Sequence, residues 1–192
     1  MLYKIARAIA RFYLKFICGM KVEGNENLSE NGAAVICANH IHLLDPAALI
    51  ADTNRWVSFL AKKEIFEKRF FRWIFTKLDA IPVERDGTDT VAVMKALRVL
   101  KKGGLLGIFP EGTRERGRGM LEFKSGAAFI SIVSKAPVIP AYIEGRYVPF
   151  GKLRVVFGSS LIPPDIKKPD TSDLKEFSDR IAQAITGLKE KQ

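Results

Sequence analysis

Short apolar runs alternate with longer amphipathic segments along most of the chain. The short runs are typical of buried strands, and the longer segments show the three- and four-residue spacing of helices. Strands are predicted at residues 20–23, 33–38, 56–60, 80–83, 105–109, 138–144 and 153–157. Helices are predicted at residues 1–18, 45–51, 61–78, 90–102, 126–135 and 171–189. Because the two kinds of element alternate, we expect a single α/β domain whose mixed, largely parallel sheet is flanked by helices.

The N-terminal segment, residues 1–18, carries two stripes when it is placed on a helix. The basic stripe is Lys4, Arg7, Arg11 and Lys15, and the apolar stripe is Leu2, Ile5, Ile9, Phe12 and Phe16. Because all the charges are basic, this pattern favours an amphipathic helix in the membrane interface over a surface helix packed on its own domain. The segment lacks both the apolar run of ~20 residues that spans a bilayer and the pattern of a signal peptide. We therefore expect a membrane-interface helix at residues 1–18 and a main domain at residues 19–192.

Basic residues predominate in the composition. Lys and Arg number 31 against 21 Asp and Glu, so the formal net charge is +10. This excess predicts an anionic partner, such as nucleic acid, anionic lipid or a phosphorylated substrate. Nucleic acid is disfavoured because no helix-turn-helix, zinc-finger or RNA-recognition pattern is present. The two cysteines, Cys18 and Cys37, both lie in apolar stretches and indicate a reducing compartment.

Polar residues gather after three of the predicted strands, at residues 39–45, 84–86 and 110–124. Loops at the carboxyl ends of parallel strands meet at one edge of a sheet, so we expect these segments to form one site. The first segment contains both histidines of the chain, His40 and His42. An imidazole at a strand end is a candidate general base, and Asp45 at the start of the next helix can reach back to accept its N–H. The alternative is that His40 only ends a strand and Asp45 only caps a helix.

Other functions are compatible with some of these residues. His40 and His42 would suit a metal, but the chain has no third histidine, so we expect no metal site. A thioesterase or lipid hydrolase would use the His40–Asp45 pair on water, but the Gly-x-Ser-x-Gly elbow of serine hydrolases is absent. A further alternative is a basic membrane- or nucleic-acid-binding module without catalysis.

Arginine and glycine recur in the second and third polar segments. Arg85 follows one predicted strand, and Arg114 lies in a glycine-containing loop after another. Arginines on such loops suit a phosphate, because a guanidinium group binds two of its oxygens at once and glycine permits close approach. Lys124 is a further phosphate-binding candidate by its charge and position. The alternative is a local network in which Glu111 and Glu115 pair with the arginines of this loop.

The residues in these segments, taken in order, resemble those of the glycerolipid acyltransferases. Four blocks occur in the order of that family: Asn39-His40-x4-Asp45-Pro46, Ala80-Ile81-Pro82-Val83-Glu84-Arg85, Phe109-Pro110-Glu111-Gly112-Thr113-Arg114 and Val138-Ile139-Pro140-Ala141. The match spans about residues 33–145, and four blocks in order are far more specific than any single block. The chain is most similar to the bacterial 1-acylglycerol-3-phosphate acyltransferases, also called lysophosphatidate acyltransferases.

This resemblance implies direct acyl transfer, without a cofactor, from acyl-CoA or acyl carrier protein to the free hydroxyl of lysophosphatidate. The product would be phosphatidate, an intermediate of phospholipid biosynthesis. His40 would deprotonate the hydroxyl, and Asp45 would orient the imidazole. The remaining roles would be phosphate binding by Arg85 and Arg114 and shaping of the loop by Glu111, Gly112 and Thr113. The acceptor stays open, because relatives acylate other lyso-lipids or glycerol 3-phosphate with the same pair of residues.

The resemblance leaves two further features open. His42 occupies a position where family members commonly carry serine or another small polar residue, so it could tune His40, contact substrate or do neither. The aromatic residues within 65–75 would either line the acyl-chain path or pack in the core. With residues 1–18 as the membrane contact, we expect a peripheral or monotopic enzyme on the cytoplasmic face of the cell membrane, with no nucleic-acid partner.

Overall fold

A computed structural model describes the backbone of residues 2–28, 31–84, 89–112 and 123–190 and, apart from residues 2–4 and 6, their side chains. Its strands are β1 (Lys21–Glu23), β2 (Ala34–Ala38), β3 (Val57–Lys62), β4 (Ile81–Val83), β5 (Leu105–Ile108), β6 (Val138–Glu144) and β7 (Arg154–Phe157). Its α-helices are α1 (Leu2–Phe12), α2 (Asp45–Ile50), α3 (Arg69–Lys77), α4 (Thr90–Lys101), α5 (Gly126–Ser134) and α6 (Thr171–Gly187). A π-helical turn, η1 (Tyr13–Ile17), continues α1, and short 3-10 turns are η2 (Asn25–Asn27) and η3 (Lys63–Phe66).

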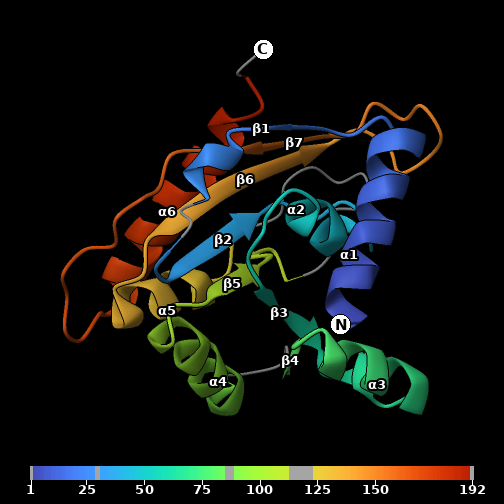
Figure 1. Cartoon of the computed structure of the whole chain (residues 1–192). Helices are drawn as coiled ribbons and strands as arrows, with labels where there is room; N and C mark the ends of the chain where they lie inside the picture. Colours follow the sequence, from blue (N-terminus) through green and yellow to red (C-terminus); the bar gives the residue numbers. More distant parts are fainter. Residues whose placement is uncertain (1, 29–30, 85–88, 113–122, 191–192) are drawn as a thin grey trace.

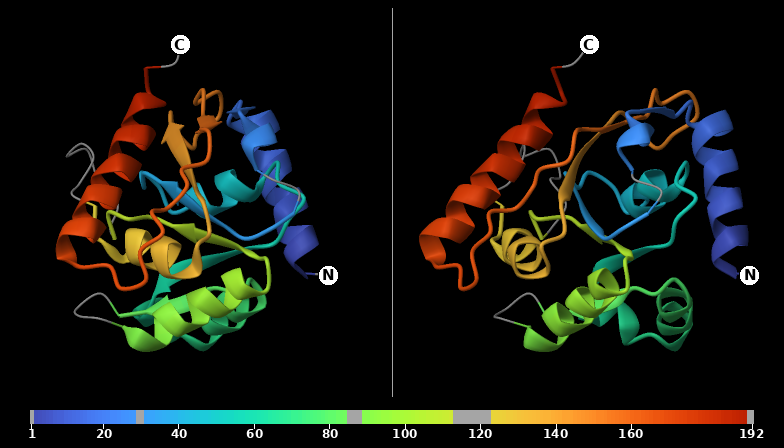
Figure 2. Two further views of the ribbon diagram at one scale, coloured as in Figure 1. Left: turned by 90° about the vertical axis from the view of Figure 1, so that its left-hand side faces the viewer. Right: turned by 60° about the vertical axis from the view of Figure 1, so that its left-hand side comes forward.

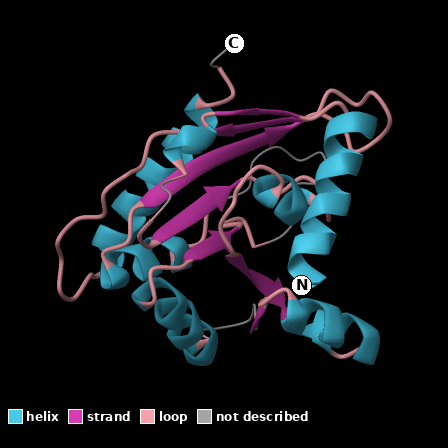
Figure 3. Cartoon of the chain, in the orientation of Figure 1, coloured by secondary structure: helices cyan, strands magenta, loops and turns pink. Residues whose placement is uncertain are grey.

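The described strands form one sheet in the order β1-β7-β6-β2-β5-β3-β4 (Figure 1, Figure 3). Strands β6, β2, β5, β3 and β4 run parallel to one another, and β7 pairs antiparallel with β6. The carboxyl ends of these parallel strands therefore lie at one edge, on the right-hand side of Figure 1, where α1, α2 and α3 are drawn. This arrangement confirms the predicted α/β class and the mixed, largely parallel sheet.

Strand β2 is buried on both of its faces because helices cover both sides of the sheet. Val35 and Cys37 belong to an apolar cluster that includes residues of α4, α5 and α6. Ile36 and Ala38 belong to a second cluster that includes residues of α1, η1 and α2. Figure 2 shows α6 and α1 on opposite sides of the strands. The uninterrupted apolar run of this strand thus reflects burial on two faces, as is usual in parallel sheets.

The predicted helix at residues 61–78 is wrong in its first half. Strand β3 extends to Lys62 because its last residues pair with β4, and the 3-10 turn η3 precedes the start of α3 at Arg69. Pairing with a neighbouring strand satisfies backbone groups of both strands, and this tertiary contact outweighs a local helical pattern. The aromatic residues that follow are carried on α3, in which no residue is buried.

Helix α1 and its continuation η1 pack on the domain through their basic side. Arg7 Nη1 donates a hydrogen bond to the carbonyl of Thr53, while Arg11 and Lys15 pair with Asp52 at 3.4 and 2.7 Å. The apolar stripe consequently faces outward, and its exposed members are Ile5, Ile9, Phe12 and Phe16. Among the described residues, no helix combines the length and the apolar character that crossing a bilayer requires.

Candidate active site

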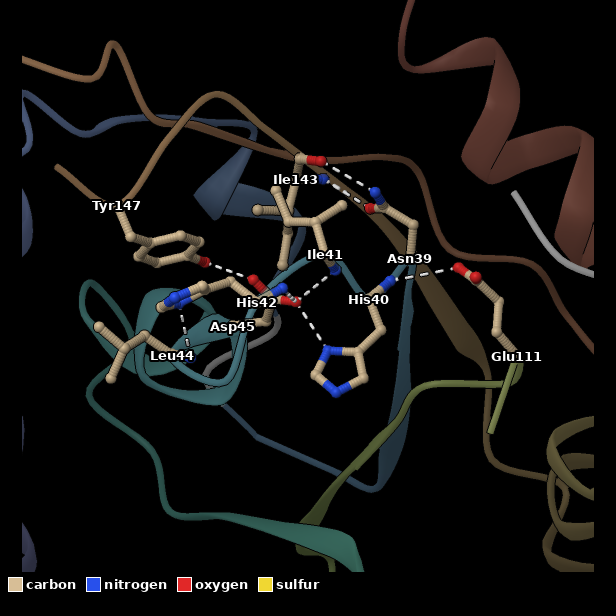
Figure 4. Close-up of polar contacts among 9 residues, drawn as sticks. All are labelled: Asn39, His40, Ile41, His42, Leu44, Asp45, Glu111, Ile143 and Tyr147. Carbon is tan, nitrogen blue, oxygen red and sulfur yellow. Dashed lines mark hydrogen bonds and ion pairs between the residues drawn. The ribbon is translucent and has the colours of Figure 1, made fainter. Parts of the chain in front are cut away.

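The loop after β2 carries the histidines to the carboxyl edge of the sheet. Asn39, at the start of this loop, is buried and pairs with the backbone of β6. Its Nδ2 donates to the Ile143 carbonyl at 2.8 Å, and its Oδ1 accepts the Ile143 N–H at 2.7 Å (Figure 4). This two-way bond holds the end of β2 against β6, so that His40 leaves the sheet at a fixed point.

His40 and Asp45 are brought into direct contact. Nδ1 of His40 lies 2.7 Å from Oδ2 of Asp45. Because a carboxylate only accepts hydrogen bonds, this contact assigns the proton to Nδ1 and leaves the lone pair on Nε2. Nε2 points away from Asp45 (Figure 4), and His40 lines a cavity of about 690 Å³. The imidazole therefore presents a basic nitrogen beside a space that a substrate can enter.

Asp45 is fully buried and holds its own loop as well as the imidazole. Its Oδ2 also accepts the backbone N–H groups of Ile41 and His42, at 2.7 and 2.8 Å, and its Oδ1 accepts the Tyr147 hydroxyl at 2.5 Å. These donors, together with the His40 ring, compensate for the removal of the carboxylate from water. Helix α2 begins at Asp45 itself and has no side-chain cap bond. The alternative that Asp45 serves only as a helix cap is therefore wrong.

Tyr147 is a residue of this site that was not predicted from the sequence. It lies in the loop after β6, which ends at the same edge of the sheet as β2. The strand-end rule that selected the other polar loops would also have selected this one. Burial and the neighbouring charge of Asp45 raise the pKa of Tyr147 well above its ordinary value, so its hydroxyl stays protonated and donates.

His42 faces Tyr147 rather than the His40 ring. The two rings stack with their centroids 4.4 Å apart, and Nδ1 of His42 accepts the N–H of Leu44 at 3.2 Å. The His42 ring thus supports Tyr147, which contacts Asp45. This arrangement differs from a direct tuning of His40 by His42. Its side chain is exposed, and the sequence left its role open.

Aromatic stacking and a buried carboxylate hold His40 from the β5 side. Phe109 stacks on the His40 ring with centroids 4.2 Å apart, and Phe59 stacks on Phe109 at 6.1 Å. Gly107 makes room for this stack, because a Cβ at that position would lie 2.2 Å from an atom of the Phe59 ring. Glu111 is buried, and its Oε1 accepts the backbone N–H of His40 at 3.2 Å. Both the ring and the backbone of His40 are therefore fixed.

The cavity beside His40 is bordered by α4, α5 and the ends of β3, β4 and β5, and it is mainly apolar. Its apolar lining includes Leu60, Val93, Leu97, Phe129, Ile130 and Leu174. Lys124 also lines it and packs over Gly112, whose φ of +67° is a left-handed conformation that favours glycine. No residue within 65–75 lines this cavity or belongs to the two apolar clusters of the described core. Packing in the described core is therefore wrong for this segment, whereas its place along the acyl-chain path stays a prediction.

The structure describes only some of the remaining predicted site residues. Arg85, Thr113 and Arg114 lie outside the described residues, so their roles stay predictions. The residues just before them, Glu84 and Gly112, line the same cavity as His40. Within the described part of the chain, no three His, Cys, Asp or Glu side chains are grouped as a metal ion would need.

Comparison with known proteins shows which family the chain resembles. The sequence model of the acyltransferase family matches residues 19–144, which is more than half of the chain. The 1-acyl-sn-glycerol-3-phosphate acyltransferase of Bacillus subtilis (strain 168) is 28% identical over 197 residues, which covers 99% of this chain and 98% of that protein. A chloroplastic 1-acyl-sn-glycerol-3-phosphate acyltransferase of Arabidopsis thaliana is 31% identical over 137 residues, which covers 69% of this chain but 38% of that protein.

A solved structure shares the fold. The crystal structure of the 1-acyl-sn-glycerophosphate (LPA) acyltransferase from Thermotoga maritima superimposes with a TM-score of 0.74 and 24% sequence identity, covering 100% of this chain and 81% of that chain. At this identity the likeness bears on the fold, whereas the family follows from the sequence match over residues 19–144. These matches confirm the resemblance of the four sequence blocks, and the chain belongs to the acyltransferase family.

Proposed function

We propose that this enzyme transfers a fatty acyl chain from acyl-CoA or acyl carrier protein to the free hydroxyl of 1-acylglycerol 3-phosphate, giving phosphatidate for phospholipid biosynthesis. One observation carries the proposal. The Nδ1 atom of His40 is bonded to the buried carboxylate of Asp45, and His40 lines an apolar cavity. The names of the matched relatives support this choice of acceptor.

In this mechanism His40 acts first as a general base and then as a general acid. Its Nε2 takes the proton of the acceptor hydroxyl while the hydroxyl oxygen attacks the thioester carbonyl. Asp45 stabilises the imidazolium that forms. When the tetrahedral intermediate collapses, the C–S bond breaks and the imidazolium returns its proton to the departing thiolate. An ester and a free thiol leave, and His40 ends neutral.

The cavity and the basic residues suit opposite ends of the substrates. Apolar side chains such as Leu97 and Phe129 provide the surroundings that a fatty acyl chain prefers over water. Lys124 lines the same cavity and supplies a positive charge for the acceptor phosphate. We place Arg85 and Arg114 in the same role, because the segments that carry them follow β4 and β5, whose ends border this cavity.

Residues 1–18 form the proposed membrane contact of the acyltransferase domain at residues 19–192. The outward apolar stripe of α1 supports this role, because it is free to enter the boundary between headgroups and acyl chains. The basic side of the helix is already engaged by Asp52 and Thr53. The enzyme would then work as a peripheral or monotopic protein at the cytoplasmic face of the cell membrane, where a lipid acceptor and an acyl thioester can meet.

The test is acyl transfer by the purified protein to lysophosphatidate, other lysophospholipids and glycerol 3-phosphate, each with acyl-CoA and with acyl carrier protein. Lysophosphatidate should react fastest. A different preferred acceptor would replace the substrate and keep the mechanism, whereas release of free fatty acid without any acceptor would indicate a hydrolase.

Two variants test the assigned roles. His40→Ala should lower turnover by about 10²–10⁴-fold, the usual contribution of a general base, and near-normal activity would refute the mechanism. Arg114→Ala should mainly raise the KM for the acceptor, on the order of tenfold or more, because the phosphate is bound alike in the ground state and the transition state. An unchanged KM would remove Arg114 from the phosphate site.

A further inference from the structure

Helix α3 (Arg69–Lys77) exposes an aromatic surface that neither the core nor the cavity uses. Phe70, Phe71 and Trp73 are 67%, 43% and 54% exposed, and no residue of the helix is buried. Neighbouring aromatic side chains left in water forfeit the free energy that their burial would contribute. A cluster of this kind on a protein surface marks a contact with a partner or a membrane.

The charges on helix α3 itself are all positive, and exposed Glu67 lies just before Lys68. Arg69, Arg72 and Lys77 lie on α3, Lys68 precedes it, and the helix has no acidic residue. All of these cations are exposed, and the ion pairs found in the described part of the chain involve other residues. The partner should therefore combine an apolar layer with negative charge. A bilayer that contains anionic phospholipids offers both, with the charge at the headgroups and the apolar layer directly beneath.

Helix α3 lies at the same edge of the molecule as α1. In Figure 1 both helices are drawn on the right-hand side, where the parallel strands end, and α3 lies below the N-terminal end of α1. The right-hand view of Figure 2 again places α3 below that end of α1. The outward apolar stripe of α1 and the aromatic surface of α3 are therefore carried by the edge of the molecule that also carries the His40 loop.

We propose that α3 is a second membrane-contacting helix, which places Phe70, Phe71 and Trp73 in the headgroup–acyl boundary of an anionic phospholipid bilayer. Contact through α1 alone leaves the domain able to tilt about that helix, whereas a second contact fixes its orientation on the bilayer. The cations of α3 draw the helix to the surface, and its aromatic rings hold it there. The choice of a bilayer as the occupant rests on the proposed function, since the acceptor proposed there is a membrane lipid.

The two tryptophans of the chain, Trp56 and Trp73, make α3 directly observable. In a Trp56→Phe protein, Trp73 is the only tryptophan. Its emission should shift to the blue on phosphatidylglycerol vesicles and should be quenched by phospholipids that carry bromine on their acyl chains. Unchanged, unquenched emission on vesicles that bind the protein would overturn the proposal.

Vesicle co-sedimentation measures what the aromatic rings contribute. Replacing Phe70, Phe71 and Trp73 together by alanine should weaken binding to phosphatidylglycerol vesicles by about tenfold or more, because the apolar area available for insertion is lost. Ile162→Ala is the matched control, since Ile162 is 68% exposed and lies between β7 and α6, a segment drawn on the opposite side of Figure 1. Equal binding by the triple variant and the wild-type protein would contradict the proposal, as would an equal loss in the Ile162→Ala control.

The basic residues call for a separate comparison. Arg69→Gln combined with Lys77→Gln should weaken binding to phosphatidylglycerol vesicles more than to phosphatidylcholine vesicles, and it should reduce the dependence on salt. Lys167→Gln combined with Lys168→Gln makes the same change of charge at two exposed residues before α6 and should have less effect. If both pairs behaved alike, the contribution would come from net charge and not from α3.

Two outcomes separate this proposal from its competitors. A concentration-dependent dimer that Phe70→Ala abolishes, with vesicle binding intact, would show that a second copy of the chain covers α3.

Acyl transfer to an acceptor dispersed in detergent tests the proposed enzymatic function separately from the membrane contact of α3. The α3 triple variant should keep the wild-type rate there, because its substitutions do not touch the cavity. Absence of transfer by the wild-type protein would refute the proposed function and leave the vesicle results standing.

Discussion

The substitution Asp45→Asn separates the chemical role of this carboxylate from its structural role. Asparagine has nearly the same shape, and its carbonyl oxygen can take the place of Oδ2, which accepts from His40, Ile41 and His42. Its amide nitrogen would then face Tyr147, whose hydroxyl can turn to accept a hydrogen bond instead of donating one. The loop keeps its hydrogen bonds, and the negative charge beside the imidazole is lost.

The loss of this charge should appear mainly in the rate. Two unit charges roughly 4 Å apart in an effective dielectric of about 20 attract each other by about 4 kcal/mol, and Asp45 exerts this attraction on the imidazolium form of His40. Since each ~1.4 kcal/mol is a factor of ten, kcat should fall by about 10³-fold. The hydrogen bonds of the loop change from charge-assisted to neutral, so the free energy of unfolding should fall by only about 1–3 kcal/mol.

The assay pairs kinetics with folding. Steady-state thiol release from the acyl thioester in the presence of lysophosphatidate gives kcat and KM, and thermal unfolding followed by circular dichroism confirms that the variant is folded. Tyr147→Phe is the matched control, because it removes one hydrogen bond to Asp45 and leaves the charge and the His40 contact in place. Its kcat should change by less than about tenfold. A folded Asp45→Asn protein with kcat within about fivefold of the wild type would refute the electrostatic role of Asp45.

Burial of particular groups leads to three other expected outcomes. Because the pKa of Tyr147 is raised in the folded protein, the unfolded chain loses the Tyr147 hydroxyl proton first as pH rises. The free energy of unfolding should therefore be unaffected below about pH 10 and fall above it by up to ~1.4 kcal/mol per pH unit. Chemical unfolding of Tyr147→Phe should show a weaker decline at alkaline pH. Gly107→Ala should lower the free energy of unfolding by about 1–3 kcal/mol, because its Cβ would lie 2.2 Å from the Phe59 ring, and an unchanged Tm would contradict this packing. Burial raises the pKa of Cys37 to about 12, so a thiol reagent at about pH 8 should label it only after unfolding, and rapid labelling of the native protein would count against this.

Local sequence patterns determined the class of the fold and the position of most elements. The strand at residues 34–38 is apolar throughout because both of its faces are buried, and this makes it recognisable without its neighbours. The helix that begins at Thr171 is equally local, since Asp170 and Asp173 cap its start. His40 and Asp45 were also within reach of the sequence, because five positions separate them and a single loop connects them.

Only the tertiary structure decided which groups complete the site and which surfaces stay uncovered. Asn39 pairs with Ile143 and Asp45 with Tyr147 across 104 and 102 positions, and no local spacing specifies contacts of that kind. The pattern of residues 1–18 established two stripes but left open which of them faces the domain. The structure shows that the basic stripe does. Likewise, the aromatic residues of α3 have the composition of a core and lie exposed. A sequence records which side chains are apolar, whereas the packing of distant segments decides which of them find a partner within the chain.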